Sequence, residues 1–179
     1  MSQIWFTSDT HFGHDRDFVW GVRGFKNVDE MNKEIIKRWN SVVAKDDIVY
    51  HLGDVMLGEN ERGLYYLKQL KGTIYIALGN HDTSTRADLY RNCYNVADVQ
   101  LEYRIKAGKR TLILNHYPVI TANGEDTRTL CLYGHTHQTT NFYENRPYMY
   151  HVGVDSHNCY PIKLEDVLAE IIDKKKGNN

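Results

Sequence analysis

Residues 73–82 have the sequence TIYIALGNHD, a largely apolar run that ends in Gly79-Asn80-His81-Asp82. The β-branched and aromatic content of the run, together with the Lys71-Gly72 boundary before it, predicts a buried strand. The tetrapeptide then lies at the carboxyl end of that strand, where open α/β sheets bind ligands. A Gly-Asn turn at this place can hold an amide oxygen and an imidazole above the sheet edge with little steric conflict.

Four further groups of acidic and imidazole side chains also follow apolar runs. They are Asp9-Thr10-His11, Gly53-Asp54, Asn115-His116 and Gly134-His135-Thr136-His137. One tetrapeptide is weak evidence for a functional site. The recurrence of the same residue types after successive apolar runs makes residues 79–82 the centre around which the chain is organised.

The composition is that of one globular domain. The chain has 179 residues, of which 41% are hydrophobic and 25% charged, so it can bury a core of normal size. We expect a single domain over residues 1–173 and a basic and polar tail over residues 174–179, with Lys174-Lys175-Lys176 as a solvated charge run. The formal net charge of −1 gives no long-range attraction to nucleic acid, so binding of a polyanion must come from local charge or metal.

Cysteine usage and the lengths of the apolar runs indicate the compartment. Cys93, Cys131 and Cys159 are an odd number without CxxC spacing, which argues against a disulfide framework and against a thiolate zinc site. Residues 1–6 carry no basic signal-peptide region, and no apolar stretch approaches the roughly 20 residues of a membrane span. We therefore expect a cytoplasmic protein without a membrane partner.

Hydrophobic periodicity predicts a β-α-β-α-β order for the first half of the chain. Strands are expected at residues 3–8, 47–52 and 73–78, and helices at residues 28–44 and 60–70. Asn27 with Glu30 resembles a capping box before the first helix, and Gly72 suits the C′ position of the second. The strands should be parallel and joined by right-handed crossovers. Residues 15–26 are irregular and form a candidate lid.

The pattern changes in the second half. A short helical stretch is expected at residues 84–92, and strands at residues 101–106, 110–115, 129–133 and 146–152. Ala107-Gly108-Lys109 has the spacing of a hairpin turn between the first two of these strands. A terminal helix is expected from the apolar stripe of Leu164, Val167, Leu168, Ile171 and Ile172.

The polar residues after the predicted strands resemble a set of metal ligands. Asp9 and His11 are two residues apart, so they can share one metal ion if strand geometry persists into the turn, and Asp54 at the end of the next strand can bridge two ions. Asn80, His116, His135 and His137 bring the ligands to seven. Seven side chains exceed the usual protein shell of one ion, and ligands without thiolate favour Mn²⁺, Fe or Zn²⁺ in an open site.

Two such ions can clamp the attacking and leaving oxygens of a displacement at phosphorus. His81 lies outside this ligand set, which leaves it free for acid–base chemistry.

The ordered motifs DxH, GD, GNHD, H and GHTH, from Asp9 to His137, resemble those of the calcineurin-like metallophosphoesterase superfamily. Residues 5–14, WFTSDTHFGH, are further similar to the small single-domain bacterial and phage phosphoesterases of that superfamily. The resemblance implies an α/β fold in which two mixed β-sheets form a sandwich flanked by helices. It also implies two divalent metal ions, with Mn²⁺ the first expectation and Fe, Zn²⁺, Ni²⁺ or Mg²⁺ the alternatives.

The resemblance also implies a role for each motif residue. Asp9, His11 and His137 would hold the first metal, Asp54 would bridge, and Asn80, His116 and His135 would hold the second. His81 would contact phosphate and protonate the leaving group.

The sequence departs from the phosphoprotein phosphatases of that superfamily. Their GDxxDRG motif carries a second Asp that supports the catalytic His and an Arg that binds phosphate, whereas Asp54 is followed here by Val55-Met56-Leu57-Gly58. A protein-phosphatase activity is therefore not expected. Phosphate contact is instead predicted for His14, Arg16, Arg23 or Asn80.

Other residues near the motifs have structural interpretations. His51 lies in a predicted strand and is expected to be a satisfied core or supporting residue, while His151 and His157 are expected to support the site or line its rim. Asp82 is expected to fix its turn or to cap the following helix. His14 either lines the substrate pocket or hydrogen-bonds its own loop.

Three functions are compatible with these residues. The favoured one is a dinuclear metal-dependent phosphoesterase for small phosphodiesters or nucleotide phosphates, with a metal-bound hydroxide as nucleophile and His81 as general acid. A DNA or RNA nuclease is disfavoured because backbone binding needs several Lys or Arg contacts. A non-catalytic scaffold of the same fold is disfavoured because His81 and the full ligand set are present. Only residues 15–26 and about 120–128 are long enough to overhang the motifs, so we expect an open groove.

Overall fold

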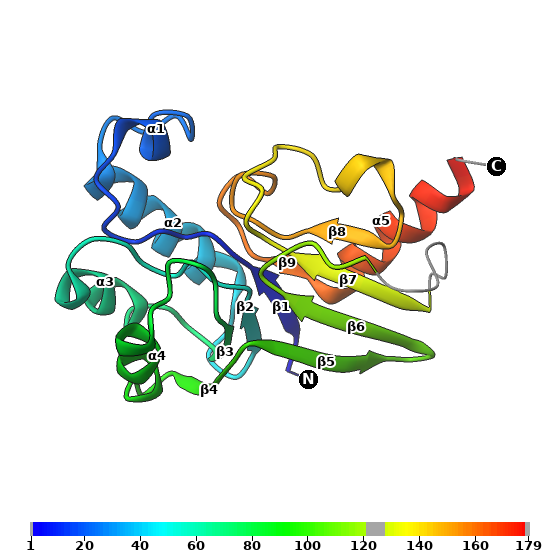
Figure 1. Ribbon diagram of the computed structural model, residues 1–179, viewed down its shortest axis with the longest axis horizontal. Coiled ribbons are helices and arrows are strands. Elements are labelled where there is room, and N and C mark those ends of the chain that lie inside the picture. Colours follow the sequence, from blue (N-terminus) through cyan, green and yellow to red (C-terminus); the bar gives the residue numbers. More distant parts are fainter. Residues whose placement is uncertain (1, 121–127, 178–179) are drawn as a thin grey trace.

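Two sheets form the centre of the structure, a computed structural model that describes residues 2–120 and 128–177 (Figure 1). The first sheet has the strand order β4-β3-β2-β1-β9. Its strands are β1 (Ile4–Thr7), β2 (Ile48–His51), β3 (Thr73–Ala77), β4 (Val96–Gln100) and β9 (Ile162–Lys163). The strands β1 to β4 are parallel, as the β-α-β-α-β pattern predicts for the first three, and β9 is antiparallel to β1.

The second sheet has the order β5-β6-β7-β8. Its strands are β5 (Glu102–Ala107), β6 (Arg110–Asn115), β7 (Thr129–Tyr133) and β8 (Met149–His151). β5 and β6 form the predicted antiparallel hairpin, with Gly108 at φ +60°, and β6, β7 and β8 are parallel. The predicted sandwich of two mixed sheets flanked by helices is therefore confirmed.

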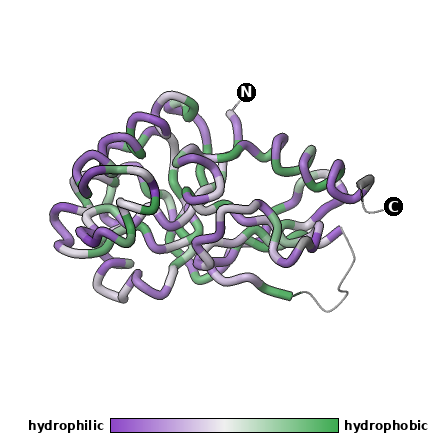
Figure 2. The backbone as a smooth tube through the Cα atoms, turned by 90° about the horizontal axis from the view of Figure 1, so that it is seen from above, coloured by the Kyte–Doolittle hydropathy of each residue, from purple (hydrophilic) through white to green (hydrophobic). Residues whose placement is uncertain are grey.

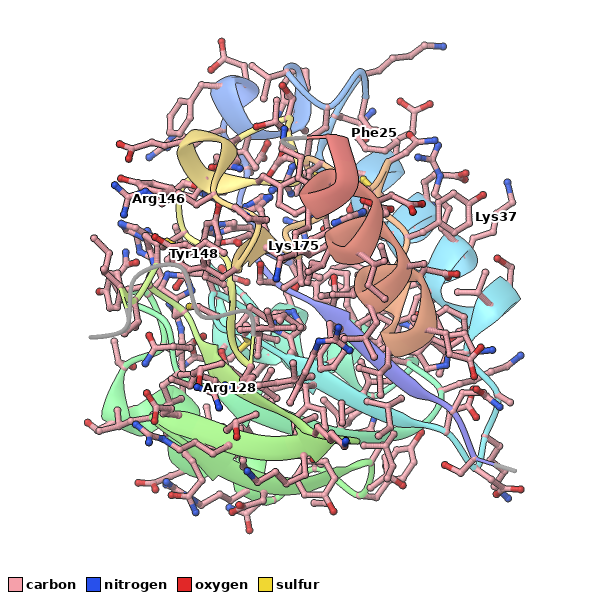
Figure 3. All side chains as sticks on the ribbon, turned by 90° about the vertical axis from the view of Figure 1, so that its right-hand side faces the viewer. Phe25, Lys37, Arg128, Arg146, Tyr148 and Lys175 are labelled. Atoms are coloured by element: carbon pink, nitrogen blue, oxygen red, sulfur yellow. The ribbon has the colours of Figure 1, made fainter. Side chains whose placement is uncertain are left out.

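Three helices cover one face of the first sheet: α2 (Val28–Val42), α3 (Asn60–Leu67) and α4 (Ser84–Arg91). The apolar stripe of α2, with Met31, Ile35 and Trp39, packs in one cluster with the strand residues Val49 and Ile74. The Asn27 side chain accepts a hydrogen bond from the Glu30 N–H at 2.9 Å, as the capping-box pattern predicts. The opposite face of α2 meets solvent, and Figure 3 shows Lys37 extending away from the body.

The other face of the first sheet packs against the second sheet. Phe6 of β1 joins Leu114 of β6 and Leu132 of β7 in a second apolar cluster. The helix α5 (Leu164–Gly177) adds Val167 and Ile171 to this cluster, and Figure 2 shows hydrophobic and hydrophilic residues alternating along it. α5 continues to Gly177, past residue 173, where the sequence predicts that the domain ends and the tail begins.

The sequence does not predict four short elements. α1 (Asp17–Trp20) lies within the segment expected to be irregular, and the 3-10 turn η1 (Tyr143–Asn145) lies before β8. The edge strands β4 and β9 are the other two. The C′ prediction for Gly72 is wrong, because α3 ends at Leu67 with Lys68 as its C-cap. Gly72, at φ +92°, instead turns the chain into β3.

The strand ends that carry the polar motifs meet at one edge of the two sheets. β1, β2 and β3 are parallel neighbours, so the motifs after them emerge on the same side. A bridge between Ser8 and Gly153 joins the loops after β1 and β8, and the Nδ1–H of His116 after β6 donates to the Leu52 carbonyl after β2 at 2.8 Å. Within residues 2–120 and 128–177, no helix is long and apolar enough to cross a membrane.

Candidate metal centre

The loop after β1 brings Asp9 and His11 together, but its backbone conformation differs from the extended one that the sequence analysis expected. Strand geometry does not persist into the turn: the two residues adopt φ values of 58° and 49°. Their N–H groups donate to the carbonyls of Gly53 and Asp54 at 2.9 and 3.1 Å, which holds this conformation in place. Asp9 Oδ1 and His11 Nε2 lie 3.9 Å apart, so both can reach one ion.

Left-handed backbone is shared by most of the predicted ligands. Asp9, His11, Asp54, His135 and His137 all have positive φ although none is glycine. Such conformations cost about 1–3 kcal/mol each and persist where the surrounding structure enforces them. They concentrate here at the residues that the motifs single out, as is common at functional sites.

A first group of ligand atoms comes from Asp9, His11 and His137, which lie within 4.8 Å of one another. His137 Nε2 is 3.3 Å from His11 Nε2 and 3.9 Å from Asp9 Oδ1. His137 Nδ1 donates to the carboxylate of Asp155 at 2.9 Å, so its Nε2 carries the free lone pair toward the other two residues.

A second group comes from Asp9, Asp54 and His116, also within 4.8 Å of one another. Asp54 Oδ2 lies 3.5 Å from His116 Nε2 and 3.7 Å from His11 Nε2, which places it between the two groups. His116 donates through Nδ1 to Leu52, so its free Nε2 faces the Asn80 Oδ1 acceptor at 2.9 Å. Asp9 belongs to both groups.

His135 approaches the same centre from the second sheet. Its backbone N–H donates to Asp9 Oδ2 at 3.0 Å, and its ring centroid is 5.0 Å from that of His116. The structure thus brings all seven predicted ligands to one place.

The donor set fits divalent cations. Asp9 and Asp54 are buried, and no Lys or Arg of the described residues forms an ion pair with either carboxylate. Burial raises the pKa of Asp9 and lowers that of His11 well below 6.5, which favours an uncharged imidazole. The free lone pairs of His116 and His137 face other acceptors, an arrangement that is repulsive unless a cation or proton lies between them.

Asp82 fixes the two central loops, as one of its two interpretations predicts. Its carboxylate accepts hydrogen bonds from the N–H groups of Asp54, Val55 and Gly79 at 2.7, 3.2 and 2.9 Å, and from the Tyr90 hydroxyl at 2.7 Å. Thr83, and not Asp82, caps α4 through its hydroxyl. Asp82 therefore ties the Asp54 loop to the turn that carries Asn80.

His81 projects into the open part of the site. Its side chain is 42% exposed, and Nε2 lies 4.0 Å from Asp54 Oδ2. Its backbone is fixed on both sides, because its N–H donates to Asp54 Oδ1 at 2.8 Å and its carbonyl accepts from Arg86 Nη1 at 2.7 Å. Arg86 is a positioning residue that no sequence motif revealed.

The three residues predicted to contact substrate have different positions. His14 lines a cavity beside the ligand cluster, while Arg16 is exposed and lies outside that lining. Arg23 is committed to the protein: its five N–H groups contact Asp155 twice, the carbonyls of Asp9 and Thr10, and Met31 Sδ. The geometry therefore contradicts the prediction that Arg23 binds phosphate and makes it a structural clamp.

Asp155 is a site residue that the sequence analysis missed. Its carboxylate lies between His137 and Arg23, and these two partners outweigh burial and lower its pKa. A weaker signal was present in the sequence, since Asp155 lies two residues after Gly153, whereas Asp54 directly follows Gly53.

The remaining histidines support the site from behind. His51 is buried with Nε2 2.9 Å from the Thr10 hydroxyl, as expected for a supporting core residue. His151 is buried with Nδ1 2.8 Å from the Ser156 hydroxyl, and His157 Nε2 donates to the His151 carbonyl at 2.8 Å. None of the three reaches the ligand cluster through a hydrogen bond in the described part of the chain.

A cavity of about 320 Å³ opens beside the cluster. It is lined by His11, His81 and His137 of the motifs, by Phe18 and Val19 of α1, and by Val22 in the turn after α1. Residues of the segment expected to be a lid therefore line the cavity beside the ligand cluster. The second expected overhang, residues 120–128, lies almost wholly outside the described residues.

Comparison with known proteins decides the family. The sequence model of the family "Calcineurin-like phosphoesterase" matches residues 2–178, nearly the whole chain. The chain belongs to the calcineurin-like phosphoesterase family. This family is metal-dependent and points to a phosphoester hydrolase, and the two ligand groups are candidates for its metal site.

Two relatives by sequence extend the comparison. The chain is 32% identical over 187 residues to an uncharacterized protein of Methanocaldococcus jannaschii, MJ1445, covering 98% of this chain and 94% of that protein. It is 29% identical over 164 residues to the Gene 66 protein of Mycobacterium phage L5, covering 76% of this chain and 78% of that protein.

Solved structures support the fold. A protein of unknown function from Aquifex aeolicus, AQ665, superposes with a TM-score of 0.74 at 22% identity, covering 94% of this chain and 99% of that one. The phosphoesterase YfcE from E. coli has a TM-score of 0.51 at 16% identity, covering 84% of this chain and 78% of that one. At these identities the likeness concerns the fold alone.

Proposed function

We propose that this protein is a dinuclear metal-dependent phosphoesterase that hydrolyses small phosphodiesters or nucleotide phosphates. The observation that carries the proposal is the pair of ligand groups that share Asp9, with Asp54 Oδ2 between His11 and His116. Two overlapping groups of this kind match two adjacent ions better than one. The members expected to hold them are Asp9, His11 and His137 for one ion, Asn80, His116 and His135 for the other, and Asp54 for both.

The chemistry that bound divalent ions supply at such a site is stabilisation of charge on phosphoryl oxygens and activation of water at neutral pH. Mn²⁺ is our first choice, because carboxylate, amide and imidazole ligands without thiolate suit it, with Fe, Zn²⁺, Ni²⁺ and Mg²⁺ as alternatives. Two carboxylates position the proposed ligands. Asp82 hydrogen-bonds the N–H groups of Asp54 and Gly79 and so joins their two loops, and Asp155 orients the His137 ring.

His81 is proposed as the general acid. Its ring is partly exposed at the cavity while its backbone is fixed by Asp54 and Arg86, so it can reach a substrate oxygen without belonging to a ligand group. A proton held on this imidazole would pass to the ester oxygen as the bond to phosphorus breaks.

The nuclease and the scaffold are weaker proposals. Among the described residues that line the cavity, Arg23 is the one Lys or Arg, and because the protein engages it, it is not free to follow a phosphate backbone. A scaffold without activity has no need of the strained ligand backbone or of His81. We also keep the expectation of a cytoplasmic enzyme, supported by the three free, buried cysteines Cys93, Cys131 and Cys159.

The test is a metal-by-substrate screen on protein stripped of metal and reloaded with each candidate ion. We expect turnover of bis-p-nitrophenyl phosphate or a 2′,3′-cyclic nucleotide with Mn²⁺, and a KM that changes little with ionic strength. Turnover of oligonucleotides alone, with a KM that rises steeply between low and moderate salt, would favour the nuclease. Tight metal binding without hydrolysis of any phosphoester would favour the scaffold.

A further inference from the structure

The cavity beside the ligand cluster has two unlike walls. One carries the imidazoles of His11, His81 and His137, and the other carries the apolar side chains of Phe18, Val19 and Val22. Phe18 is 65% exposed and Val22 is 78% exposed, so apolar surface faces the open cavity. Exposed apolar surface that lines a functional cavity indicates a ligand with an apolar part.

This apolar wall is held in place by the core and by a buried ion pair. Val19 is buried in the cluster beneath α2, and Trp20 packs against that cluster. Arg23, directly after Val22, is tied to Asp155 at 2.8 Å. Phe18 also meets the His14 ring edge-on, with centroids 5.8 Å apart and an interplanar angle of 89°. The wall is therefore preformed, which lowers the entropic cost of binding against it.

The charges of the lining restrict the ligand further. Among the described residues that line the cavity, Arg23 is the one Lys or Arg, and all its N–H groups contact protein acceptors. The described lining therefore offers no free Lys or Arg that could neutralise a second phosphate or a carboxylate on the part of the substrate that lies against Phe18. An anionic substituent would be desolvated at this wall without a lysine or arginine partner.

We propose that the substrate's leaving group carries an uncharged aromatic ring that binds against Phe18 and Val22. We assign the ring to the leaving group because His81, the proposed proton donor, lines the same cavity as Phe18 and Val22. Aromatic rings gain attraction from edge-on and offset contacts beyond the area they bury. The volume of about 320 Å³ is at the small end of ligand sites, enough for a phosphate and one ring system. This inference rests on the proposed phosphoesterase function and adds the substrate class.

Binding of two phosphonates separates recognition from chemistry. Phenylphosphonate and methylphosphonate carry the same charged group and differ by the ring, so calorimetry on the metal-loaded protein measures the ring's contribution. We expect phenylphosphonate to bind about tenfold more tightly to the wild-type protein, the size of a buried aromatic contact. Phe18→Ala should abolish this preference and leave the affinity for methylphosphonate unchanged.

Tyr65→Ala is the matched control, because Tyr65 is 64% exposed on α3 and does not line the cavity. It should retain the full preference. Equal affinity for the two phosphonates in the wild-type protein, or an unchanged preference in Phe18→Ala, would overturn the inference. These outcomes would leave the proposed phosphoesterase function unaffected. If neither phosphonate binds and no ester is hydrolysed, the proposed function and the inference about the aromatic ring are both wrong.

A kinetic comparison identifies the source of the ring. Aryl and fluoroalkyl diesters with leaving groups of matched pKa should differ about tenfold in kcat/KM with the wild-type enzyme and become equal in Phe18→Ala. If Phe18→Ala also lowers kcat/KM for 2′,3′-cyclic nucleotides, the ring is a nucleobase. If it lowers kcat/KM for aryl esters alone, the ring is a simple aryl group. An unchanged kcat/KM for both substrate classes in Phe18→Ala would overturn the inference.

Discussion

The carboxylate of Asp155 accepts a hydrogen bond from His137 Nδ1 at 2.9 Å. Arg23 holds the same carboxylate through Nε and Nη2 at 2.8 and 3.2 Å, and its Nη2 also donates to the main-chain carbonyl of Asp9 at 2.8 Å. Asp155 thus fixes the tautomer and orientation of one proposed ligand, while Arg23 ties this pair to the loop of another. Carboxylates in this position strengthen metal binding by the imidazole.

Asp155→Asn should weaken binding of one metal ion by about 10–100-fold, because the amide orients His137 less well and removes a negative charge beside it. Calorimetric titration of the metal-free variant with Mn²⁺ or Zn²⁺ measures the change. Asp88→Asn is the control, since Asp88 is a solvent-exposed carboxylate on α4 that pairs with Arg91. An affinity in Asp155→Asn equal to that of the control would show that Asp155 has no such role.

Asp54→Asn should remove more activity than any other single ligand change. Its Oδ2 lies near His11 and His116 of the two groups, so the substitution withdraws negative charge from both proposed ions at once. The amide oxygen can still accept from the His81 N–H, as Asp54 Oδ1 does at 2.8 Å, so the loop is preserved. Elemental analysis should show metal lost with activity. Two retained ions and near-wild-type turnover would rule out the bridging role.

His81→Ala should leave the metal content intact and lower turnover about 10²–10⁴-fold, the usual contribution of a general acid. The loss should shrink for esters whose leaving groups have a low pKa, since these need no proton. Steady-state kinetics on a series of aryl and alkyl diesters measures the trend. A loss of the same size for every leaving group would assign His81 to substrate positioning instead.

The stability of the metal-free protein should fall as the pH is lowered from about 6.5 to 4. Thr10 donates to the Val55 carbonyl at 2.8 Å, so its hydroxyl accepts from His51 Nε2 and leaves Nδ1 buried without a partner. Burial lowers the pKa of His51 to about 4 and that of His151 to about 3. In this window these two histidines bind more protons in the unfolded chain than in the folded one, so their protonation favours unfolding in acid.

His51→Gln should reduce this pH dependence. A shift from 6.5 to about 4 corresponds to about 3 kcal/mol of stability that is present above pH 6.5 and lost by pH 4. Urea unfolding at several pH values measures the slope, and an unchanged m-value confirms that both proteins unfold to the same extent. If the variant loses stability with pH as steeply as the wild-type protein, His51 is not buried in its neutral form.

The amino-acid sequence determined the order of the main elements and the identity of the candidate ligands. Strong local patterns carried these predictions: the apolar run of β3, the capping box of Asn27 and Glu30, and polar motifs placed directly after strands. Such patterns are local, because a strand alternates every two residues and a helix repeats every 3.6. β4 escaped detection because it is an edge strand with a single buried residue, and β9 because two residues carry no period.

The tertiary structure alone decided which polar groups became partners. Arg23 looked like a free cation, but Asp155, 132 residues away in sequence, engages it, and Asp82 reaches the N–H of Asp54 across 28 residues. The left-handed backbone of Asp9 and His11 is likewise imposed by hydrogen bonds to the neighbouring loop. A buried charge or donor must find a partner wherever the packed chain supplies one, and that choice depends on distances that no local pattern encodes.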